Sequence, residues 1–407
     1  MGRHSISRVE APKLYNPYSY HRPHFVRWKG SVIPKVLPST IVVTIIAVIV
    51  CIIQLVVGIK ISIQSSFITI LGFVVGLLLT YRTNTAYDRY WEGRRLWSTM
   101  VVSIRNLTRN IWVNIQEGDD EINDLLEKKT AINLLLGFAV ATKHYLREEE
   151  GSQYADLKPL ISNIKTSLPG FKPLDEQDLS ENEIKTGKRT SKKLFALNEK
   201  PPSINHNLPL EISHYISSYI DDQRRKDKVD APSVTSMYGA LNTLVDCLTQ
   251  FERILRSPIP LAYSIHLSQT VWIYCLSLPF QLVDTVKYVT IPIVFFATLV
   301  LMGIMQIGEE IENPFGYDEN DLDLDDFCGI LKRELNTITS HPKPTVVDWV
   351  YNSKNRPFGP EEVTASEARR LSLDEVRDLL TTSFIADKRV SLDNTIKEGS
   401  DVTIKII

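Results

Sequence analysis

The sequence predicts an all-α, polytopic membrane protein with four transmembrane helices and a helical cytosolic region. Three observations predict this class. Four stretches contain no charged residue, and a helix that crosses the hydrocarbon core of a bilayer needs about 20 mainly apolar residues. Apolar residues between the second and third stretches recur at the spacing of one helix face. Lysine and arginine are concentrated outside the stretches, on one predicted side of the membrane.

The overall composition excludes several classes of protein. Of the 407 residues, 43% are apolar and 23% are charged, which excludes a disordered chain, and four cysteines are too few for a disulfide scaffold. The net charge of -2 leaves no basic excess that could neutralise nucleic-acid phosphates. The sequence also lacks a G-x-S-x-G, Walker, H-E-x-x-H, CxxC or dinucleotide-binding motif. It therefore predicts neither an enzyme nor a nucleic-acid partner.

The charge-free stretches form two pairs, each joined by a short charged connector. They cover residues 36–59, 61–81, 257–283 and 288–308. The third stretch contains His266, Gln269 and Gln281, so we expect it to need protein neighbours in the membrane. The alternative is a set of central helices in a large soluble core, and four paired stretches of this length argue against it.

The distribution of Lys and Arg predicts the orientation in the membrane. Residues 1–35 contain seven of them, whereas the two connectors hold only Lys60 and Lys287. By the positive-inside rule, both termini and the long middle segment face the cytosol. Either the plasma membrane or an organelle membrane fits this prediction. The predicted units are an N-terminal cytosolic segment, a first transmembrane pair, a cytosolic helical region with a polar insertion at about 167–209, a second transmembrane pair, and an acidic segment with a cytosolic tail. They cover residues 1–35, 36–81, 82–256, 257–308 and 309–407.

Helical spacing continues beyond the second stretch. No proline occurs between Ser39 and Lys158, so we predict that the second transmembrane helix runs on into the cytosol. Its expected buried stripe consists of Tyr90, Trp97, Val101, Ile104 and Ile111. Glu92 is expected to pair within this helix with Arg89 and Arg95.

Further helices are predicted in the rest of the cytosolic part, over residues 124–149, 233–256 and 372–382. One apolar stripe marks the second of them, formed by Met237, Leu241, Leu244, Leu248 and Phe251. The final residues, VTIKII, are expected to form an edge strand or to be disordered.

The second stretch carries the first candidate site. Ser66, Ile70, Val74 and Leu78 share one helical face, and Gly72 with Gly76 forms a small-residue pair that lets a neighbouring helix approach closely. Several copies of this face around an axis would form an apolar constriction that closes by dewetting. An ordinary lipid-facing or packed helix has the same periodicity and is the commoner case, so periodicity alone does not decide.

Two further segments could bind ions. Residues 309–326 contain nine carboxylates and no basic residue, which could bind Ca²⁺ or concentrate cations, although they do not form an EF-hand. Alternatively, residues 309–326 form a solvated acidic segment that caps the next helix. In residues 257–269, Pro258 and Pro260 precede the third stretch, where a helix N-terminus would favour anions. His266 could bind an ion there, but a packed histidine is commoner.

The sequence resembles the bestrophin family of ion channels, in the branch shared by bacteria, plants and fungi. The matching motifs are LLLTYRTNTAYDRYWEGRRLW at 77–97, SPIPLAY at 257–263 and IENPFGYDENDLDLD at 311–325. This resemblance implies a homopentamer in the lipid bilayer whose second helices line an apolar-necked central pore. It implies passive flux of chloride and other monovalent anions. A monovalent cation channel of the same architecture and a non-conducting membrane scaffold remain alternatives.

The resemblance also implies site residues. Aligned on the motif from Arg82 to Asn84, it places Ile70 and Val74 on the pore neck, with Leu78 beyond. Aligned on the Gly-Phe pair instead, it places Phe73 there. Ile259 matches the family's cytosolic aperture.

A Ca²⁺ clasp of animal members matches Asn313, Asp318 and Asp321, but Tyr317 stands where those members have a carboxylate. We therefore expect no required cofactor and a structural role for this segment, with Ca²⁺ binding as the alternative.

Overall fold

The computed structural model describes residues 28, 30–63, 65–149, 154–165, 207–359 and 363–382, without the side chains of residues 65–68. Every regular element within these ranges is helical. Most of the predicted insertion and the VTIKII tail lie outside them.

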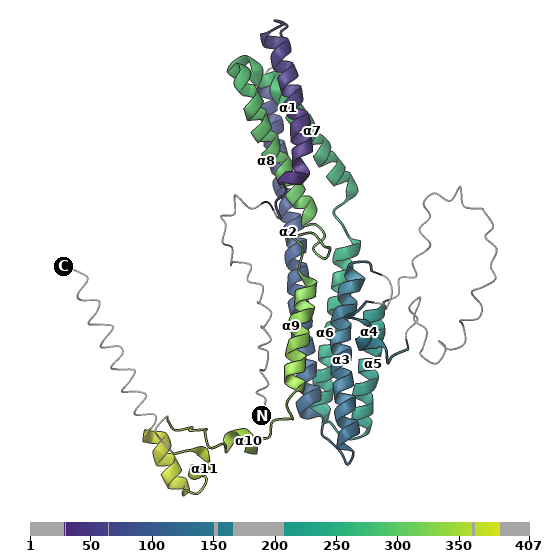
Figure 1. Cartoon of the computed structure of the whole chain (residues 1–407), viewed down its shortest axis with the longest axis vertical. Coiled ribbons are helices and arrows are strands. Elements are labelled where there is room, and N and C mark those ends of the chain that lie inside the picture. Colours follow the sequence, from purple (N-terminus) through teal and green to yellow (C-terminus); the bar gives the residue numbers. More distant parts are fainter. Residues whose placement is uncertain are drawn as a thin grey trace, which may run out of the picture.

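All four charge-free stretches are helical in the structure. They correspond to α1 (Ile33–Leu55), the first part of α2 (Ser65–Arg109), α7 (Leu261–Val286) and α8 (Thr290–Glu310), with a short 3-10 turn, η4 (Lys287–Val289), between the last two. These helices gather at one end of the molecule (Figure 1) around a core that includes Val43, Val75 and Val271. Two segments of the described chain are long and apolar enough to cross a membrane, Ile33–Leu55 and Leu261–Glu310.

The α2 helix connects this end to the rest of the molecule. It is continuous over 45 residues, so it extends about 68 Å at 1.5 Å per residue. The predicted continuation beyond the second stretch is therefore confirmed. A π-helical turn, η2 (Asn110–Asn114), follows it and includes Ile111.

The other end of the molecule is a helical bundle around the lower half of α2 (Figure 1). It contains α3 (Glu121–Leu146), α5 (Leu208–Arg225), α6 (Ala231–Arg256) and α9 (Leu324–Thr339), with a single turn, α4 (Lys158–Ile161), at its edge. The predicted α6 stripe, from Met237 to Phe251, is buried in its core beside Trp97 and Ile104 of α2. Burial of such apolar faces is the main term that holds the bundle together.

One helix of the bundle, α5 (Leu208–Arg225), was not predicted. The polar insertion was expected to reach residue 209, but α5 begins at Leu208. Asn207 is its N-cap, because its side-chain oxygen accepts a hydrogen bond from Leu210 N–H at 3.1 Å. Ile212, Ile216 and Ile220 then bury one face at four-residue spacing.

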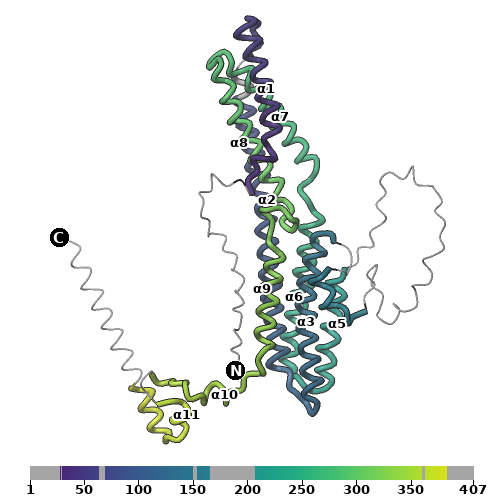
Figure 2. Tube along the Cα trace, in the orientation of Figure 1, coloured from purple at the N-terminus to yellow at the C-terminus, as the bar shows by residue number. Residues whose placement is uncertain are grey.

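Beyond α9 the chain leaves the bundle. Short helices α10 (Val346–Val350) and α11 (Ala365–Ala368) project away from the foot of α9 (Figure 2). The predicted helix at 372–382 is present from residue 373, after Ser372, whose side chain and main chain both bond Glu375.

Candidate functional site

The first half of α2 leaves an apolar face uncovered. The exposed fractions of its side chains are 68% at Ile70, 69% at Phe73, 39% at Val74 and 56% at Leu77. Leu78 is partly buried and packs against the core of the four-helix end. The exposed face therefore includes Ile70 and both of the alternative neck positions, Phe73 and Val74. Assignment of these residues to a pore stays a prediction at this point, and the Ser66 side chain lies outside the described part.

The predicted small-residue pair on α2 is used at one of its two positions. A Cβ atom on Gly72 would lie 3.0 Å from the hydroxyl oxygen of Tyr274, so glycine permits the close approach of α7 there. At Gly76, no atom from elsewhere in the described part of the chain lies within 4 Å of the corresponding position.

Arg89 joins three elements where the two ends of the molecule meet. Its guanidinium donates to the carbonyl oxygens of Ile254, at 2.6 Å, and Ser257, and its Nε donates to the carbonyl of Glu312 at 3.0 Å. The expected pairing of Glu92 with Arg89 and Arg95 is therefore wrong, since Glu92 pairs with Arg253 of α6 instead. Tertiary partners outcompete neighbours on an exposed helix face, where an ion pair contributes only about 0.3–0.5 kcal/mol.

Ile259 lies in the loop before α7. Its side chain is 9% exposed, and its main-chain N–H donates to Oε1 of Glu312 at 2.9 Å. Pro260 forms the N-cap of α7, as the two prolines of this loop predicted. His266, on the first turns of α7, is exposed. The aperture assignment of Ile259 stays a prediction.

The three residues of the possible Ca²⁺ clasp contact protein groups, two of them within the segment and one on Lys35 in the first turn of α1. The side-chain oxygen of Asn313 accepts from Phe315 N–H at 3.4 Å, Asp318 lies 3.5 Å from Lys35 Nζ, and Asp321 accepts from Asp318 N–H at 2.7 Å. Burial raises the pKa of Asp321 to about 6. Among the residues described, no group of three or more His, Cys, Asp or Glu side chains could hold a metal ion.

Other carboxylates of the acidic segment are paired with basic groups or cap a helix. Glu310 lies 2.9 Å from Lys35, and Glu312 lies 3.5 Å from Arg82. Asp323 is the N-cap of α9 and accepts from Asp326 N–H at 2.9 Å. Capping the next helix, one of the two roles considered for this segment, is therefore confirmed for Asp323.

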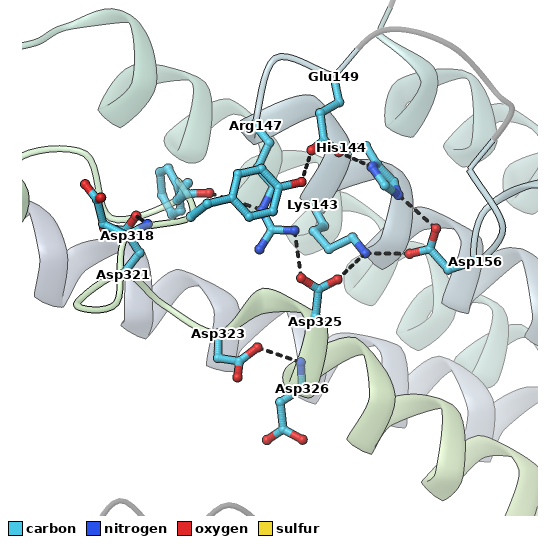
Figure 3. A network of polar contacts seen from close by, with 12 residues as sticks. Lys143, His144, Arg147, Glu149, Asp156, Asp318, Asp321, Asp323, Asp325 and Asp326 are labelled. Atoms are coloured by element: carbon cyan, nitrogen blue, oxygen red, sulfur yellow. Dashed lines mark hydrogen bonds and ion pairs between the residues drawn. The ribbon is translucent and has the colours of Figure 1, made fainter. Parts of the chain in front are cut away.

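A polar network joins this segment to the end of α3 (Figure 3). Asp325 accepts from Lys143 at 2.7 Å and from Arg147 at 2.8 Å, and Lys143 also pairs with Asp156. His144 lies between Glu149 and Asp156, and Tyr317 donates to Glu149. The Arg147 guanidinium also lies over the Tyr317 ring, 4.1 Å from its centre. These contacts were not predicted.

We expect Asp325→Asn to destabilise the protein and to change its acid sensitivity. Burial opposes ionisation of Asp325, but hydrogen bonds from Lys143 and Arg147 outweigh it and hold its pKa below the usual value. A carboxyl whose pKa is lower in the folded state contributes stability above its unfolded pKa of about 3.9, and this contribution is lost as the pH falls through the folded pKa. Because Asp325 is half exposed, we expect a loss of about 1 kcal/mol at pH 7.

Thermal melts of the purified protein between pH 3 and pH 7 test this. The difference between wild type and Asp325→Asn should shrink below about pH 4. Asp326→Asn is the matched control. The Asp326 carboxylate lies 4.0 Å from Arg333, so this substitution removes a single long ion pair. Parallel melting curves for wild type and Asp325→Asn at every pH would contradict the assignment.

Comparison with known proteins identifies the family. Residues 15–337 match the model of the family described as bacterial/fungal bestrophin protein. The chain is 38% identical over 319 residues to a voltage-dependent anion channel-forming protein of Synechocystis, covering 78% of this chain and 91% of the relative. It is 41% identical over 271 residues to a protein of the same name from Nostoc, covering 67% of this chain and 76% of the relative.

The fold is also similar to that of a solved bacterial bestrophin homologue. A crystal structure of a bacterial bestrophin homologue from Klebsiella pneumoniae, carrying a single mutation, matches with a TM-score of 0.59 and 26% identity, covering 77% of this chain and all of that one. The sequence motifs, the helical architecture and the family match agree: the chain belongs to the bacterial/fungal bestrophin family.

Proposed function

We propose that this membrane protein is a homopentameric channel that passes chloride and other monovalent anions passively through the bilayer. Family membership and the names of the relatives from Synechocystis and Nostoc support an anion channel, and they indicate a channel rather than an enzyme. The observation that carries the proposal is the uncovered apolar face of α2, because a face that its own chain leaves exposed is available to line a path between subunits.

In the proposed assembly, the first halves of five α2 helices surround a central axis. Ile70 and Val74 form the neck with Leu78 beyond, and Phe73 is the alternative to Val74. The strong exposure of Ile70 and Phe73 and the intermediate exposure of Val74 support this arrangement, whereas Leu78 is partly covered by its own chain. A narrow apolar ring conducts when it is wet and closes when it dewets. It has no ligands to replace a hydration shell, so weakly hydrated anions would pass most readily.

The proposed topology has four transmembrane helices per subunit and both termini in the cytosol. The basic residues outside the charge-free stretches support this orientation. The bundle of α3, α5, α6 and α9, together with the lower half of α2, would then lie in the cytosol, with the Ile259 loop where the two ends of the molecule meet.

A cation channel of the same architecture is the second candidate, and the nine carboxylates between residues 309 and 326 favour it. Pairing within the subunit reduces their field, since Glu310, Glu312 and Asp325 each lie beside a basic side chain. Of the two candidate functions, this pairing favours the anion channel.

Reversal potentials of the purified protein in planar bilayers, under a KCl gradient, test the proposal. We expect a reversal potential close to the equilibrium potential of chloride. A reversal potential close to that of potassium would make the protein a cation channel. Reconstituted protein that carries no current of either sign would instead be a non-conducting scaffold.

We expect chelation of Ca²⁺ to leave this current largely unchanged. The carboxylate of Asp318 pairs with Lys35, that of Asp321 accepts from a main-chain N–H, and Tyr317 donates to Glu149. Addition of a Ca²⁺ chelator to both sides of the bilayer checks this, with restored Ca²⁺ as the control. A current that disappeared with the chelator and returned with Ca²⁺ would show that the segment is a Ca²⁺ sensor.

A further inference from the structure

Glu312 lies just beyond the end of α8 and makes three contacts with two other parts of the chain. Its Oε1 accepts from the N–H of Ile259 at 2.9 Å, and its Oε2 lies 3.5 Å from Nη2 of Arg82. Its main-chain carbonyl accepts from Nε of Arg89 at 3.0 Å. One residue thus joins the end of α8, the helix α2 and the loop before α7.

The main chain of the Ile259 loop has few N–H groups that could donate a hydrogen bond and so hold the loop in place. Pro258 and Pro260 have no N–H, so the Ile259 N–H is the single main-chain donor of these three residues. Glu312 occupies this donor. On the other side, Ser257 is held through its carbonyl oxygen by Arg89, which is itself bonded to Glu312. The position of Ile259 therefore depends on Glu312 directly and, through Arg89, indirectly.

The surroundings of Glu312 strengthen its hydrogen bonds and its ion pair. Its side chain is 18% exposed and that of Arg82 is 7% exposed, so water competes little for either group. Hydrogen bonds to a charged group are stronger than those between neutral groups, and more so away from water. Loss of the carboxylate would leave the Ile259 N–H and the buried Arg82 guanidinium without this partner.

We infer that Glu312 is the positioning residue of the Ile259 loop, holding it at a fixed place relative to α2. This inference rests on the proposed function, in which α2 lines the neck, and on the family resemblance, which implies that Ile259 lines the cytosolic aperture. Glu312 does not contact the permeating ion in this account. It acts through the main chain of Ile259 and so determines how narrowly the aperture selects ions by size.

Three variants separate this role from general stability. Glu312→Ala removes the acceptor and the charge. Glu312→Gln keeps an oxygen that can accept from Ile259 N–H but loses the charge. Glu312→Asp keeps the charge beside Arg82, which protects folding, but its carboxylate is one methylene shorter. Glu309→Ala is the matched control, because this glutamate near the end of the same helix is exposed.

Hydrogen exchange measured by mass spectrometry tests the contact without any current. In a peptide that contains Ile259, exchange of its amide should become about fivefold faster in Glu312→Ala and in Glu312→Asp, as expected for the loss of one hydrogen bond. Exchange in Glu309→Ala should stay at the wild-type rate, and exchange in Glu312→Gln, whose neutral oxygen is a weaker acceptor, should be slower than in Glu312→Ala. Wild-type exchange in Glu312→Asp, or exchange in Glu312→Gln as fast as in Glu312→Ala, would overturn the inference.

Permeability ratios test the consequence for conduction. The ratio of a large anion such as gluconate to chloride should rise severalfold in Glu312→Asp and in Ile259→Ala, and rise less in Glu312→Gln, which keeps an oxygen that can accept from Ile259 N–H. In the Ile259→Ala background, Glu312→Asp should have no further effect, because both changes act on one element. Fully additive effects would overturn the inference. A wild-type protein without current would instead refute the proposed function, and the exchange experiment would still decide the role of Glu312.

Discussion

Replacing Ile70 and Val74 together with alanine is expected to raise the single-channel conductance severalfold. In the proposed pore these side chains form the apolar neck, so their truncation widens the narrowest part and lowers the barrier to wetting. Both side chains are exposed in the subunit, and therefore little stability should be lost. Single-channel recordings of the purified variant in bilayers measure the effect.

A matched pair on another helix provides the control. Ile45 and Ile49 of α1 have the same four-residue spacing and exposed fractions of 54% and 49%, but α1 does not line the axis in the proposed assembly. Ile45→Ala with Ile49→Ala should leave the conductance unchanged. If Phe73→Ala raises the conductance and Val74→Ala does not, the neck follows the alternative alignment. Unchanged currents in all of these variants would remove this face of α2 from the pore.

Phe315→Ala is expected to cause the largest loss of stability. Phe315 belongs to the Asn-Pro-Phe-Gly turn after α8, and its ring is fully buried, with its centre 5.6 Å from that of Phe251. Removal of a buried phenylalanine side chain costs about 3–5 kcal/mol, which is a large part of the stability of a typical domain. We expect a strong drop in the yield of folded protein and in its melting temperature, measured after detergent extraction.

The same ring explains a glycine of the motif in α2. A Cβ atom on Gly93 would lie 3.0 Å from two ring carbons of Phe315, so the turn docks against α2 only where a side chain is missing. Phe296→Ala is the control for Phe315→Ala, because Phe296 is 62% exposed on α8. Equal melting temperatures for Phe315→Ala and Phe296→Ala would contradict the anchoring role of the turn.

Much of the helical fold could be predicted because helices impose a strong periodicity. The stripe from Met237 to Phe251 lies at helical spacing and is buried in α6, and the absence of proline after Ser39 matched the uninterrupted α2. The whole α5 helix was missed, because the polar insertion that precedes it was extended to residue 209, into its first turn. Its signal was present in Ile212, Ile216 and Ile220, which share one face.

The arrangement of the site could be predicted only in part. Which α2 side chains remain exposed depends on how α7 and α8 pack against it, so the sequence left Phe73 and Val74 as alternatives and did not single out Leu77. The network at Lys143 was missed because its partner Asp325 lies 182 positions further along the chain. A basic pair at four-residue spacing, Lys143 and Arg147, was the signal for a partner elsewhere.

The most direct test of the central claim is a structure of the assembled protein in lipid nanodiscs, determined by electron cryomicroscopy. We expect five subunits around one axis, with the first half of α2 innermost and with Ile70 and either Val74 or Phe73 facing a continuous water path. An assembly in which this part of α2 lies at the periphery, against acyl chains and away from any symmetry axis, would contradict the account.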